Sequence, residues 1–495
     1  MKLLKINKND NVAVVLKPVK QGESIVINDC SITIMEDVPK GHKVTITNVR
    51  QNEDIIKYGY PIGKASIDIK KGSWVHNHNI KTNLGDILDY IYQPQIKSQK
   101  INKCGTFKGF KRADGRVGVR NEIWIIPTVS CVNRNAALIA KEAVEKLKNK
   151  TINIDGIYEM KHPYGCSQMG EDQLYTQRIL ANLVDHPNAA AVLVLSLGCE
   201  NNNIDEFKKI LCPYDQERVK FLVAQEVEDE ISAGVELIEQ LANYAERFSR
   251  EDCDISDLSI GLKCGGSDGF SGLTANPLVG AFSDKLIMCG GTAVLTEVPE
   301  MFGAESILMN RCINEGIFKK TVELINSFKE YYKSFNQPIH ENPSPGNKAG
   351  GISTLEEKSL GCIQKGGTSN VVDVLQYGDR IKQKGLNLLN SPGNDMVASS
   401  ALAAAGCQMI LFTTGRGTPL GTCVPTIKIA SNHEIFKTKA NWMDFDASGL
   451  VSGCSIDDLS ADLWEFVIEV AEGKRTRSEA LGFREIAIFK TGVTL

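Results

Sequence analysis

The sequence predicts an α/β protein with a small all-β domain at its N-terminus. Short β-branched runs separated by turn residues fill residues 1–95, whereas apolar runs alternate with helical stretches from about residue 120 onward. That alternation is typical of a mainly parallel sheet covered by helices. The 495 residues exceed what one hydrophobic core normally holds, so we expect two or three domains.

The N-terminal domain is expected to hold strands at residues 12–16, 24–27, 31–34 and 43–47, with a turn at Asn28 and Asp29. His76 and His78 alternate near its end, so in an extended strand both rings would face one side. They are either a polar strand end or ligand-facing groups on a module that closes over the site. Residues 96–108 follow as a polar, aperiodic interdomain linker.

Two α/β domains are expected beyond the linker, at residues 109–255 and 256–495. Apolar runs predict strands at residues 123–126, 190–195, 219–223, 293–295, 386–389 and 409–412. Apolar residues recur at three- and four-residue steps over 226–248, which predicts a helix with one buried stripe.

Composition and charge exclude several classes of protein. The formal net charge of −4, with interspersed signs, gives no basic surface for nucleic acid. No apolar run approaches the length of a membrane helix, and the N-terminus turns charged too soon for a signal peptide, so a cytoplasmic location without a membrane partner is expected. The 14 cysteines are therefore expected to be reduced thiols.

Three cysteines, Cys166, Cys199 and Cys264, each follow a β-like apolar run and lie in a glycine-framed turn. If those runs are parallel strands of one sheet, all three thiols reach the edge where open α/β sheets bind ligands. The alternative is that each is a small buried apolar residue, which fits most of the other cysteines. Converging thiolates favour a soft-metal site, and iron is the metal we expect.

Two polar loops carry further candidate residues. Arg416 lies in a Thr-Gly loop directly after the predicted strand at 409–412, where it suits a substrate carboxylate, although a solvated arginine in a glycine turn is the alternative. Lys348 lies in a proline- and glycine-rich stretch, and it could bind an anion or act as a base. Glu297 and Glu300 follow the predicted strand at 293–295 and could supply oxygen ligands.

Several motifs together carry a resemblance that runs along the whole chain. They are His162-Pro-Tyr-Gly-Cys166, Leu197-Gly-Cys-Glu200, Cys264-Gly-Gly-Ser-Asp268, Asn342-Pro-Ser-Pro-Gly-Asn-Lys348, Phe412-Thr-Thr-Gly-Arg-Gly-Thr-Pro419 and Phe489-Lys-Thr-Gly-Val-Thr-Leu495. This set resembles the altronate/galactarate dehydratase family. The N-terminal domain, with Val75-His-Asn-His-Asn79, resembles the SAF (β-clip) domain of that family. The resemblance implies a Rossmann-like sheet in the C-terminal domain and a homodimer, with the second domain as a candidate for dimerisation.

The resemblance also implies an enzyme that removes water from a small-molecule sugar acid. For D-altronate the product would be 2-dehydro-3-deoxy-D-gluconate, with Fe2+, or Mn2+ in its place, under reducing conditions. The metal could be a single ion or an iron–sulfur cluster. Residues 352–362 and 486–495 resemble altronate dehydratases more than galactarate dehydratases. Galactarate dehydratase, or another sugar-acid hydro-lyase of the same family, is the alternative, and sulfolactate sulfo-lyase is a more distant relative of the same layout.

We therefore expect one site that joins metal, proton-transfer groups and substrate ligands. Cys166, Cys199 and Cys264 are assigned to the metal, with Glu200 and Glu297 as substitutes. Proton transfer is assigned to Lys348, His162, His76 and His78, and substrate binding to Arg416, Thr414, Thr418, Asn347, Ser267 and Asp268. A dinucleotide-dependent oxidoreductase is an alternative, but the phosphate-binding fingerprint is missing. A non-catalytic sugar-acid-binding protein would not need thiols, lysine and arginine at strand ends.

Overall fold

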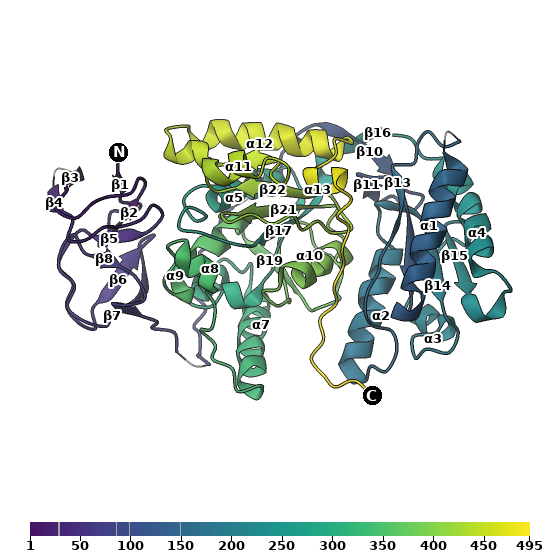
Figure 1. Ribbon diagram of the computed structural model, residues 1–495, viewed down its shortest axis with the longest axis horizontal. Coiled ribbons are helices and arrows are strands. Elements are labelled where there is room, and N and C mark those ends of the chain that lie inside the picture. The colour runs from purple at the N-terminus through teal and green to yellow at the C-terminus, as the bar shows by residue number, and fades with distance from the viewer. Residues whose placement is uncertain (28–29, 86, 99, 149) are drawn as a thin grey trace.

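The computed structural model describes residues 1–27, 30–85, 87–98, 100–148 and 150–495. Three domains lie in a row, and the C-terminal domain is in the middle, between the N-terminal domain and the second domain (Figure 1). None of the described helices is both long enough and apolar enough to span a membrane. The turn predicted at Asn28 and Asp29 lies outside the described residues.

The N-terminal domain is built from short antiparallel strands, as the β-branched runs predicted. One sheet has the order β1-β2-β5-β8, a second consists of β3 and β4, and a third has the order β6-β7-β9. The strands are β1 (Leu3–Leu4), β2 (Val12–Val15), β3 (Ser24–Ile27), β4 (Cys30–Thr33), β5 (Lys43–Thr45), β6 (Asp54–Lys57), β7 (Tyr60–Ala65), β8 (Trp74–Val75) and β9 (Ile80–Lys81).

The segment after β9 runs along the C-terminal domain before the next strand begins at Thr106. The Tyr92 hydroxyl donates to the Cys312 carbonyl at 2.5 Å. Cys104 and Cys289 form a disulfide, with their Cα atoms 5.3 Å apart. This pair departs from the prediction that the cysteines are all reduced, because folding brings two residues that are distant in sequence to disulfide distance. A small sheet of β11 (Val117–Gly118), β10 (Thr106–Lys111) and β16 (Glu251–Asp254) follows.

The second domain is a four-stranded parallel sheet with helices on both faces. Its order is β13 (Gly156–Glu159), β12 (Glu122–Pro127), β14 (Ala189–Ser196), β15 (Val219–Val223). Helices α1 (Asn133–Leu147) and α4 (Glu230–Ala245) pack on one face, and α2 (Gly170–Val184) packs on the other. The short α3 (Ile204–Lys208) follows β14. The helix predicted at 226–248 is confirmed as α4, and it is shorter because the Asp229 side chain caps its first turn.

The C-terminal domain contains a seven-stranded parallel sheet in the order β19-β20-β18-β17-β21-β22-β23. The strands are β17 (Ser259–Cys264), β18 (Thr292–Leu295), β19 (Val371–Leu375), β20 (Leu386–Leu389), β21 (Met409–Thr414), β22 (Thr426–Ala430) and β23 (Phe445–Asp446). The chain begins at β17, adds strands on one side, and then continues with β21 on the other side. The winding therefore reverses between β17 and β21, which is where sheets of this kind bind ligands.

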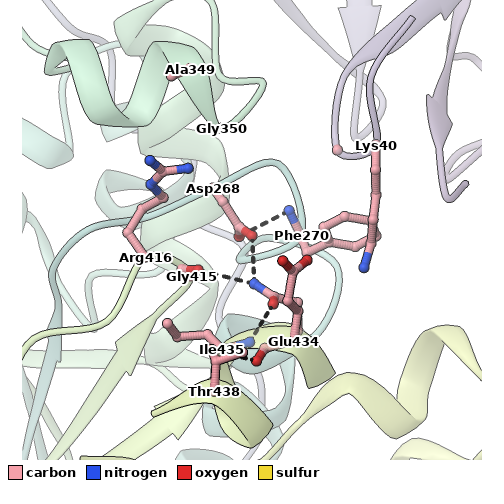
Figure 2. A pocket seen from close by; sticks show the side chains of 12 residues that line it. Lys40, Asp268, Phe270, Ala349, Gly350, Gly415, Arg416, Glu434, Ile435 and Thr438 are labelled. Atoms are coloured by element: carbon pink, nitrogen blue, oxygen red, sulfur yellow. Dashed lines mark hydrogen bonds between the residues drawn. The ribbon is translucent and has the colours of Figure 1, made fainter. Parts of the chain in front are cut away.

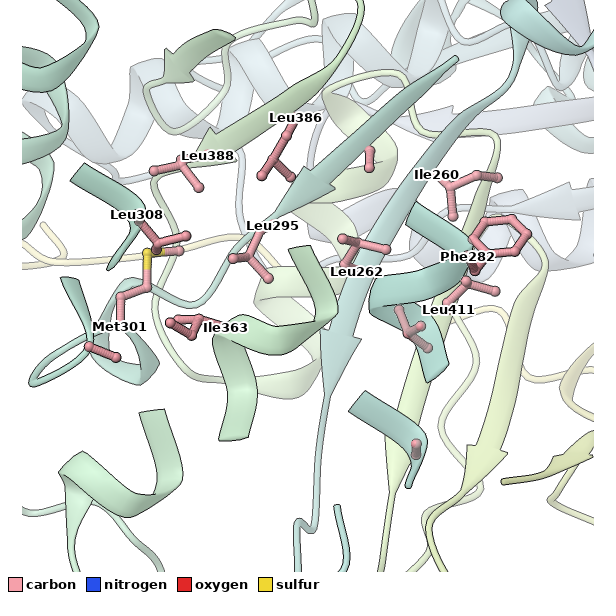
Figure 3. Packing of buried hydrophobic residues seen from close by; sticks show 14 of the residues in the cluster. Ile260, Leu262, Phe282, Leu295, Met301, Leu308, Ile363, Leu386, Leu388 and Leu411 are labelled. Atoms are coloured by element: carbon pink, nitrogen blue, oxygen red, sulfur yellow. The ribbon is translucent and has the colours of Figure 1, made fainter. Parts of the chain in front are cut away.

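Helices cover both faces of this sheet. They are α5 (Ala275–Met288), α6 (Glu305–Met309), α7 (Glu315–Ser334), α8 (Pro345–Ala349), α9 (Leu355–Cys362), α10 (Asp395–Ala404), α11 (His433–Thr438), α12 (Ile456–Ala471) and α13 (Arg477–Ala480). Ile260 and Leu262 of β17 pack with Leu411 of β21 and Phe282 of α5 (Figure 3). On the other face, α10 and β21 share one apolar core with Trp124 and α2 of the second domain. This shared core joins the two α/β domains.

The predicted architecture is confirmed at this level: an N-terminal β domain precedes two regions of parallel sheet. All six strands predicted beyond the linker are present as β12, β14, β15, β18, β20 and β21. In all of them except the partly buried β15, the β-branched and aliphatic residues are buried on both faces, which explains why these strands read as continuous apolar runs.

Candidate active site

The candidate site lies at the carboxyl edge of the seven-stranded sheet, beside the point where the winding reverses. Cys264 is the last residue of β17. Glu297 and Glu300 follow β18, and Cys362 ends α9. The backbone of Glu297 has φ 71°, a left-handed conformation that turns the chain sharply after β18.

Cys264 is the centre of a buried cluster of charged groups. Its Sγ lies 3.3 Å from Cys362 Sγ, 3.0 Å from Glu300 Oε2 and 2.8 Å from Lys365 Nζ. Lys358 Nζ pairs with Glu300 Oε1 at 2.7 Å.

Lys263 extends the same cluster on its other side. Its ammonium pairs with Glu297 and, at 2.8 Å, with Asp395 at the start of α10. Buried charges of both signs are therefore interleaved here, and each has an opposite partner.

The neighbours set the protonation states of this cluster. The hydrogen bond with the Cys362 thiol and the nearby Lys365 ammonium lower the pKa of Cys264 to about 7, and the same hydrogen bond raises the pKa of Cys362. Burial would raise the pKa of Glu300, but Lys358 outweighs it and holds that pKa far below its usual value. Burial and the neighbouring Glu300 charge raise the pKa of Glu297. Cys264 is thus the thiolate of the pair, and Glu300 is the charged carboxylate.

A cavity of about 1000 Å³ opens above this cluster. Gly265, Glu300 and Lys358 line it, and so do Lys348 and Asp395. Tyr164 of the second domain and Ile488 of the C-terminal segment also line it. The Lys348 ammonium makes no hydrogen bond or ion pair with any of the residues that the structure describes. An unpaired lysine therefore lines the same cavity as the Glu300 carboxylate, which in turn contacts the buried Cys264.

Arg416 lies in a different and smaller cavity of about 350 Å³, lined also by Lys40, Asp268 and Glu434 (Figure 2). Lys348 on α8 lines the larger cavity, whereas Ala349 and Gly350 line the smaller one. The sequence analysis predicted that Arg416 and Lys348 share one site. The structure places them in two different cavities. Thr418 lines the larger cavity.

The other predicted substrate ligands hold the loops together. Asn347 completes the capping box of α8 and donates to the Ser267 carbonyl at 2.8 Å. Asp268 accepts hydrogen bonds from Ser271 and Ser431, and the Thr414 hydroxyl accepts from the Gly417 amide at 2.9 Å. Ser267 Oγ is buried and has no hydrogen-bond partner among the described residues, so it is the one member of this group left with an unused polar atom.

His76 contacts the loop before α9, and neither His76 nor His78 lines the larger cavity. His76 and His78 lie in the turn between β8 and β9, not in a strand, and both rings contact Trp74. His76 Nδ1 lies 3.1 Å from Ser353 Oγ, and burial lowers the pKa of His76 to about 4.

Beside this histidine contact, Glu357 of α9 accepts from Lys43 and Lys57, each at 2.8 Å. All three of these side chains are buried. The N-terminal domain is therefore anchored to the helix that carries Cys362.

The prediction that Cys166, Cys199 and Cys264 meet at one sheet edge is wrong. Cys264 ends a strand of the C-terminal sheet, whereas Cys166 and Cys199 follow β13 and β14 of the separate four-stranded sheet. Cys264 is buried, but Cys166 and Cys199 are exposed. Apolar runs in sequence show that parallel strands exist but not which sheet each strand joins, and this is why the error arose.

His162 and Glu200 brace the loops of the second domain. His162 is buried; its Nε2 lies 2.8 Å from the Pro127 carbonyl and its Nδ1 accepts from the Tyr164 amide at 3.2 Å. Burial lowers the pKa of His162 to about 4. The Glu200 carboxylate accepts from Thr128 and Ser196, at 2.5 and 2.6 Å. With both ring nitrogens occupied by backbone groups, His162 is not placed to move a substrate proton.

Several residues of the site lacked a signal strong enough to be selected from the sequence. Lys263, Lys358, Lys365 and Asp395 lie in helix-like or strand-like stretches and meet only in the fold. Cys362 closes the Ile352–Cys362 stretch that contributed to the family resemblance, and this was its only signal. Glu300, in contrast, was named with Glu297 as a possible oxygen ligand, and the fold shows that it is the nearer of the two to Cys264.

Comparison with known proteins covers nearly the whole chain. Family models match in three consecutive parts: the altronate/galactarate dehydratase SAF domain at residues 1–83, the D-galactarate dehydratase/altronate hydrolase second domain at 109–246, and the D-galactarate/altronate dehydratase C-terminal domain at 255–494.

Individual relatives also match along their full length. The chain is 53% identical to an altronate dehydratase of Bacillus subtilis (strain 168), covering 99% of each chain, and 51% identical to one of Escherichia coli (strain K12), covering 100% of each. It is 32% identical to the galactarate dehydratase (L-threo-forming) of the same Escherichia coli strain, over 98% of this chain and 96% of the relative.

Proposed function

Because this chain belongs to the altronate/galactarate dehydratase family, we propose that it is a hydro-lyase that converts D-altronate to 2-dehydro-3-deoxy-D-gluconate. The observation that carries the substrate assignment is the difference in identity. Two altronate dehydratases are 53% and 51% identical to it over almost every residue, whereas the galactarate dehydratase is 32% identical over a similar length.

The larger cavity suits this reaction by its charge. The C2 proton beside a carboxylate is weakly acidic, so its removal builds up a second negative charge on the substrate. Cations that face the developing charge in a site shielded from water lower its energy most effectively. Lys348 and Lys358 both line the cavity, and the Lys358 ammonium is held there by its pair with Glu300. We assign the binding and dehydration of the sugar acid to this cavity.

Lys348 is the residue that we assign to proton transfer at C2. Its Nζ has no hydrogen-bond or ion-pair partner among the described residues, so it is free to approach the substrate, and in its amine form it can accept the C2 proton. Lys358 is paired with Glu300 and also donates to Asn342 and Asn347, which fixes its position. Lys358 therefore suits a fixed positive charge that holds the substrate carboxylate. Lys348 suits a group that exchanges a proton with the substrate.

Cys264, Glu300 and Cys362 fit a divalent metal ion on chemical grounds. Their sulfur and carboxylate donor atoms all lie within 4.8 Å of one another, and all three residues are buried. This donor set suits Fe2+, with Mn2+ as a substitute. A bound ion would supply Lewis-acid polarisation of a substrate oxygen. Lys358 and Lys365 would then share Glu300 and Cys264 with the metal.

Turnover tests the proposed reaction directly. Protein supplied with ferrous iron under anaerobic conditions is given D-altronate or galactarate, and formation of the 2-keto-3-deoxy acid is followed. The proposal expects iron-dependent product from altronate. Product from galactarate alone would assign the chain to the other activity of the family, and no product from either would contradict the assignment.

We further propose three properties that the family resemblance suggested. The seven-stranded sheet is a Rossmann-like variant in which β20 is inserted between β18 and β19. The enzyme acts as a cytoplasmic homodimer that associates through the second domain, as two-fold assemblies are the commonest oligomers. It serves hexuronate breakdown, where D-altronate is a substrate. Light scattering of the intact protein and of a variant with charged residues introduced on α1 and α4 would test the dimer.

A further inference from the structure

The carboxyl edge of the four-stranded sheet in the second domain carries three exposed cysteines on three neighbouring loops. Cys131 follows β12, Cys166 follows β13 and Cys199 follows β14. These three strands are adjacent, in the order β13-β12-β14. Consecutive parallel strands place the loops after them at the same edge, so the three thiols lie on one end of the domain.

Backbone hydrogen bonds hold the three loops against one another. The Ser130 amide donates to the Tyr164 carbonyl at 2.8 Å, which joins the Cys131 loop to the Cys166 loop. The Asn202 amide donates to the Gly165 carbonyl at 3.1 Å, which joins the Cys199 loop to the Cys166 loop.

Gly165 allows this close approach between the loops. It has φ 104°, and a Cβ there would lie 2.0 Å from the Thr128 carbonyl oxygen. Glycine is therefore required beside Cys166 for the Cys166 and Cys131 loops to meet.

The edge also coincides with the point where the winding of this sheet reverses. The chain begins at β12, adds β13 on one side, and continues with β14 and β15 on the other side. The reversal lies between β12 and β14, whose following loops carry Cys131 and Cys199. Open α/β sheets bind ligands at this place.

The sulfur positions do not suit a single metal ion. Two thiolates on one zinc ion, each about 2.3 Å from the metal, lie no more than about 4.6 Å apart. Among the described residues, the three cysteines do not form a group whose ligand atoms all lie within 4.8 Å of one another, whereas Cys264, Glu300 and Cys362 do. At least one pair of the three sulfurs is therefore too far apart to share one ion. In an iron–sulfur cluster each thiolate binds a different iron, so wider spacing is required.

We propose that Cys131, Cys166 and Cys199 hold a [4Fe–4S] cluster, with three irons bound by protein thiolates and the fourth iron open. Two ferrous ions, two ferric ions and four sulfides form the cluster without net redox change, and each of the three thiols loses its proton on binding iron. The buried Glu200 and His162 brace the three loops, so the ligands are held in place before the cluster assembles. All three thiols are exposed, so the cluster would react with oxygen.

Acid-labile sulfide tests this proposal without relying on turnover. The full-length protein is incubated anaerobically with ferrous and ferric iron and sulfide, then desalted, and iron, sulfide and visible absorption are measured. Wild-type protein should retain four sulfides with broad visible absorption, and its iron should equal the sulfide plus at most the one ion of the C-terminal site. Cys131→Ser, Cys166→Ser and Cys199→Ser should each lose most of both, with an unchanged circular dichroism spectrum.

Two controls make the result specific. Cys212→Ser removes an exposed thiol of the same domain, located between α3 and β15, and it should retain the sulfide. The double variant Cys264→Ser/Cys362→Ser removes the thiols of the C-terminal site, and it should also retain the sulfide. The proposal is overturned if wild-type protein retains no sulfide, if the three single variants retain it, or if either control loses it. Because sulfide content does not depend on the substrate, this failure is distinguishable from failure of the proposed function.

Discussion

The two parallel sheets place cysteines at the same position, the carboxyl edge beside a reversal of winding, but surround them differently. In the C-terminal sheet, Cys264 is buried among glutamates and lysines, and Lys365 lies 2.8 Å from its sulfur. In the second domain, Cys131, Cys166 and Cys199 are exposed, and the contacts of their sulfurs are with amide groups such as Asn201 and Gln225.

This difference shows that the side chains around a thiol decide the chemistry at the carboxyl edge of a parallel sheet. Buried charges of both signs create a site where protonation is controlled and a single ion fits, which suits acid–base chemistry on a sugar acid. Exposed thiols on braced loops, whose sulfurs contact amide groups and no lysine or arginine among the described residues, offer soft ligands that suit a larger metal assembly. Position in the fold predicts that a ligand binds at each edge, and the side chains around the thiols decide which ligand.

The largest effect should come from Glu300→Gln, which removes the charged carboxylate beside Cys264. Lys358 would lose its partner, and the cavity floor would lose one of its anions. We expect kcat for D-altronate to fall by about 1000-fold with little change in the folded state. Glu305→Gln is the matched control, since Glu305 is also buried and paired with a lysine, Lys329, but does not line the larger cavity. Equal losses in the two variants would contradict the assignment.

A smaller effect is expected on stability from Glu357→Gln, which would leave Lys43 and Lys57 buried without their shared carboxylate. We expect the free energy of unfolding to fall by about 3 kcal/mol in urea titrations at pH 7. The control Glu206→Gln, at an exposed pair with Lys209, should leave the midpoint nearly unchanged.

The contribution of Glu357 should also depend on pH. Burial would raise the pKa of Glu357, but Lys43 and Lys57 outweigh it and lower the pKa from 4.5 to about 2. A carboxyl group with a lowered pKa stabilises the folded state fully above 4.5, and this stabilisation is lost as pH falls towards 2. The difference between wild type and variant should therefore shrink over that range, and a constant difference would show that the charge is not responsible.

Ultraviolet titration of metal-free protein measures thiolate formation, and it can compare Cys264 with a buried cysteine that has no charged neighbours, Cys407. The difference in 240 nm absorbance between wild type and Cys264→Ser should show a thiolate step with a midpoint near pH 7, because Cys362 and Lys365 lower the pKa of Cys264. Cys407→Ser should remove no step between pH 5 and 9, since burial raises the pKa of that thiol. If Cys264→Ser leaves the titration curve unchanged, the proton is on Cys264 and the thiolate assignment is wrong.

The smallest expected effect is that of Asp172→Asn on the cysteine loops of the second domain. The buried Asp172 carboxylate accepts from the amides of Thr491 and Gly492, each at 2.7 Å, and the Leu495 amide donates to the Ser167 carbonyl beside Cys166. Losing these charge-assisted bonds should cost about 1–3 kcal/mol. Amide exchange at residues 165–168 should accelerate, whereas Glu171→Gln on the exposed side of α2 should leave it unchanged. Unchanged exchange in Asp172→Asn would mean that the C-terminal segment does not order this loop.

Much of the fold follows from local sequence patterns, but the site does not. The apolar runs that became β12, β14 and β21 are long enough to identify buried parallel strands. Which sheet each strand joins depends on contacts between distant segments, so Cys264 was wrongly grouped with Cys166 and Cys199. Lys348 was selected from the sequence because it lies near a glycine turn, and it lines the larger cavity. Lys358 and Lys365 lie in or next to α9, and no feature of the sequence distinguishes them from surface lysines. Their burial appears only once α9 is packed against the sheet.

The most direct test of the central claim is D-altronate turnover in D2O by wild type, Lys348→Arg and Lys348→Met. Removal of the C2 proton and loss of the C3 hydroxyl give an enol, which becomes the ketone by taking one solvent deuteron at C3. Wild type should therefore give a 2-keto-3-deoxy acid with one deuterium at C3, seen by proton NMR. If Lys348 transfers the proton, arginine should fail to restore turnover although it keeps the charge. Wild-type rates in both variants would contradict the assignment of dehydration to this cavity.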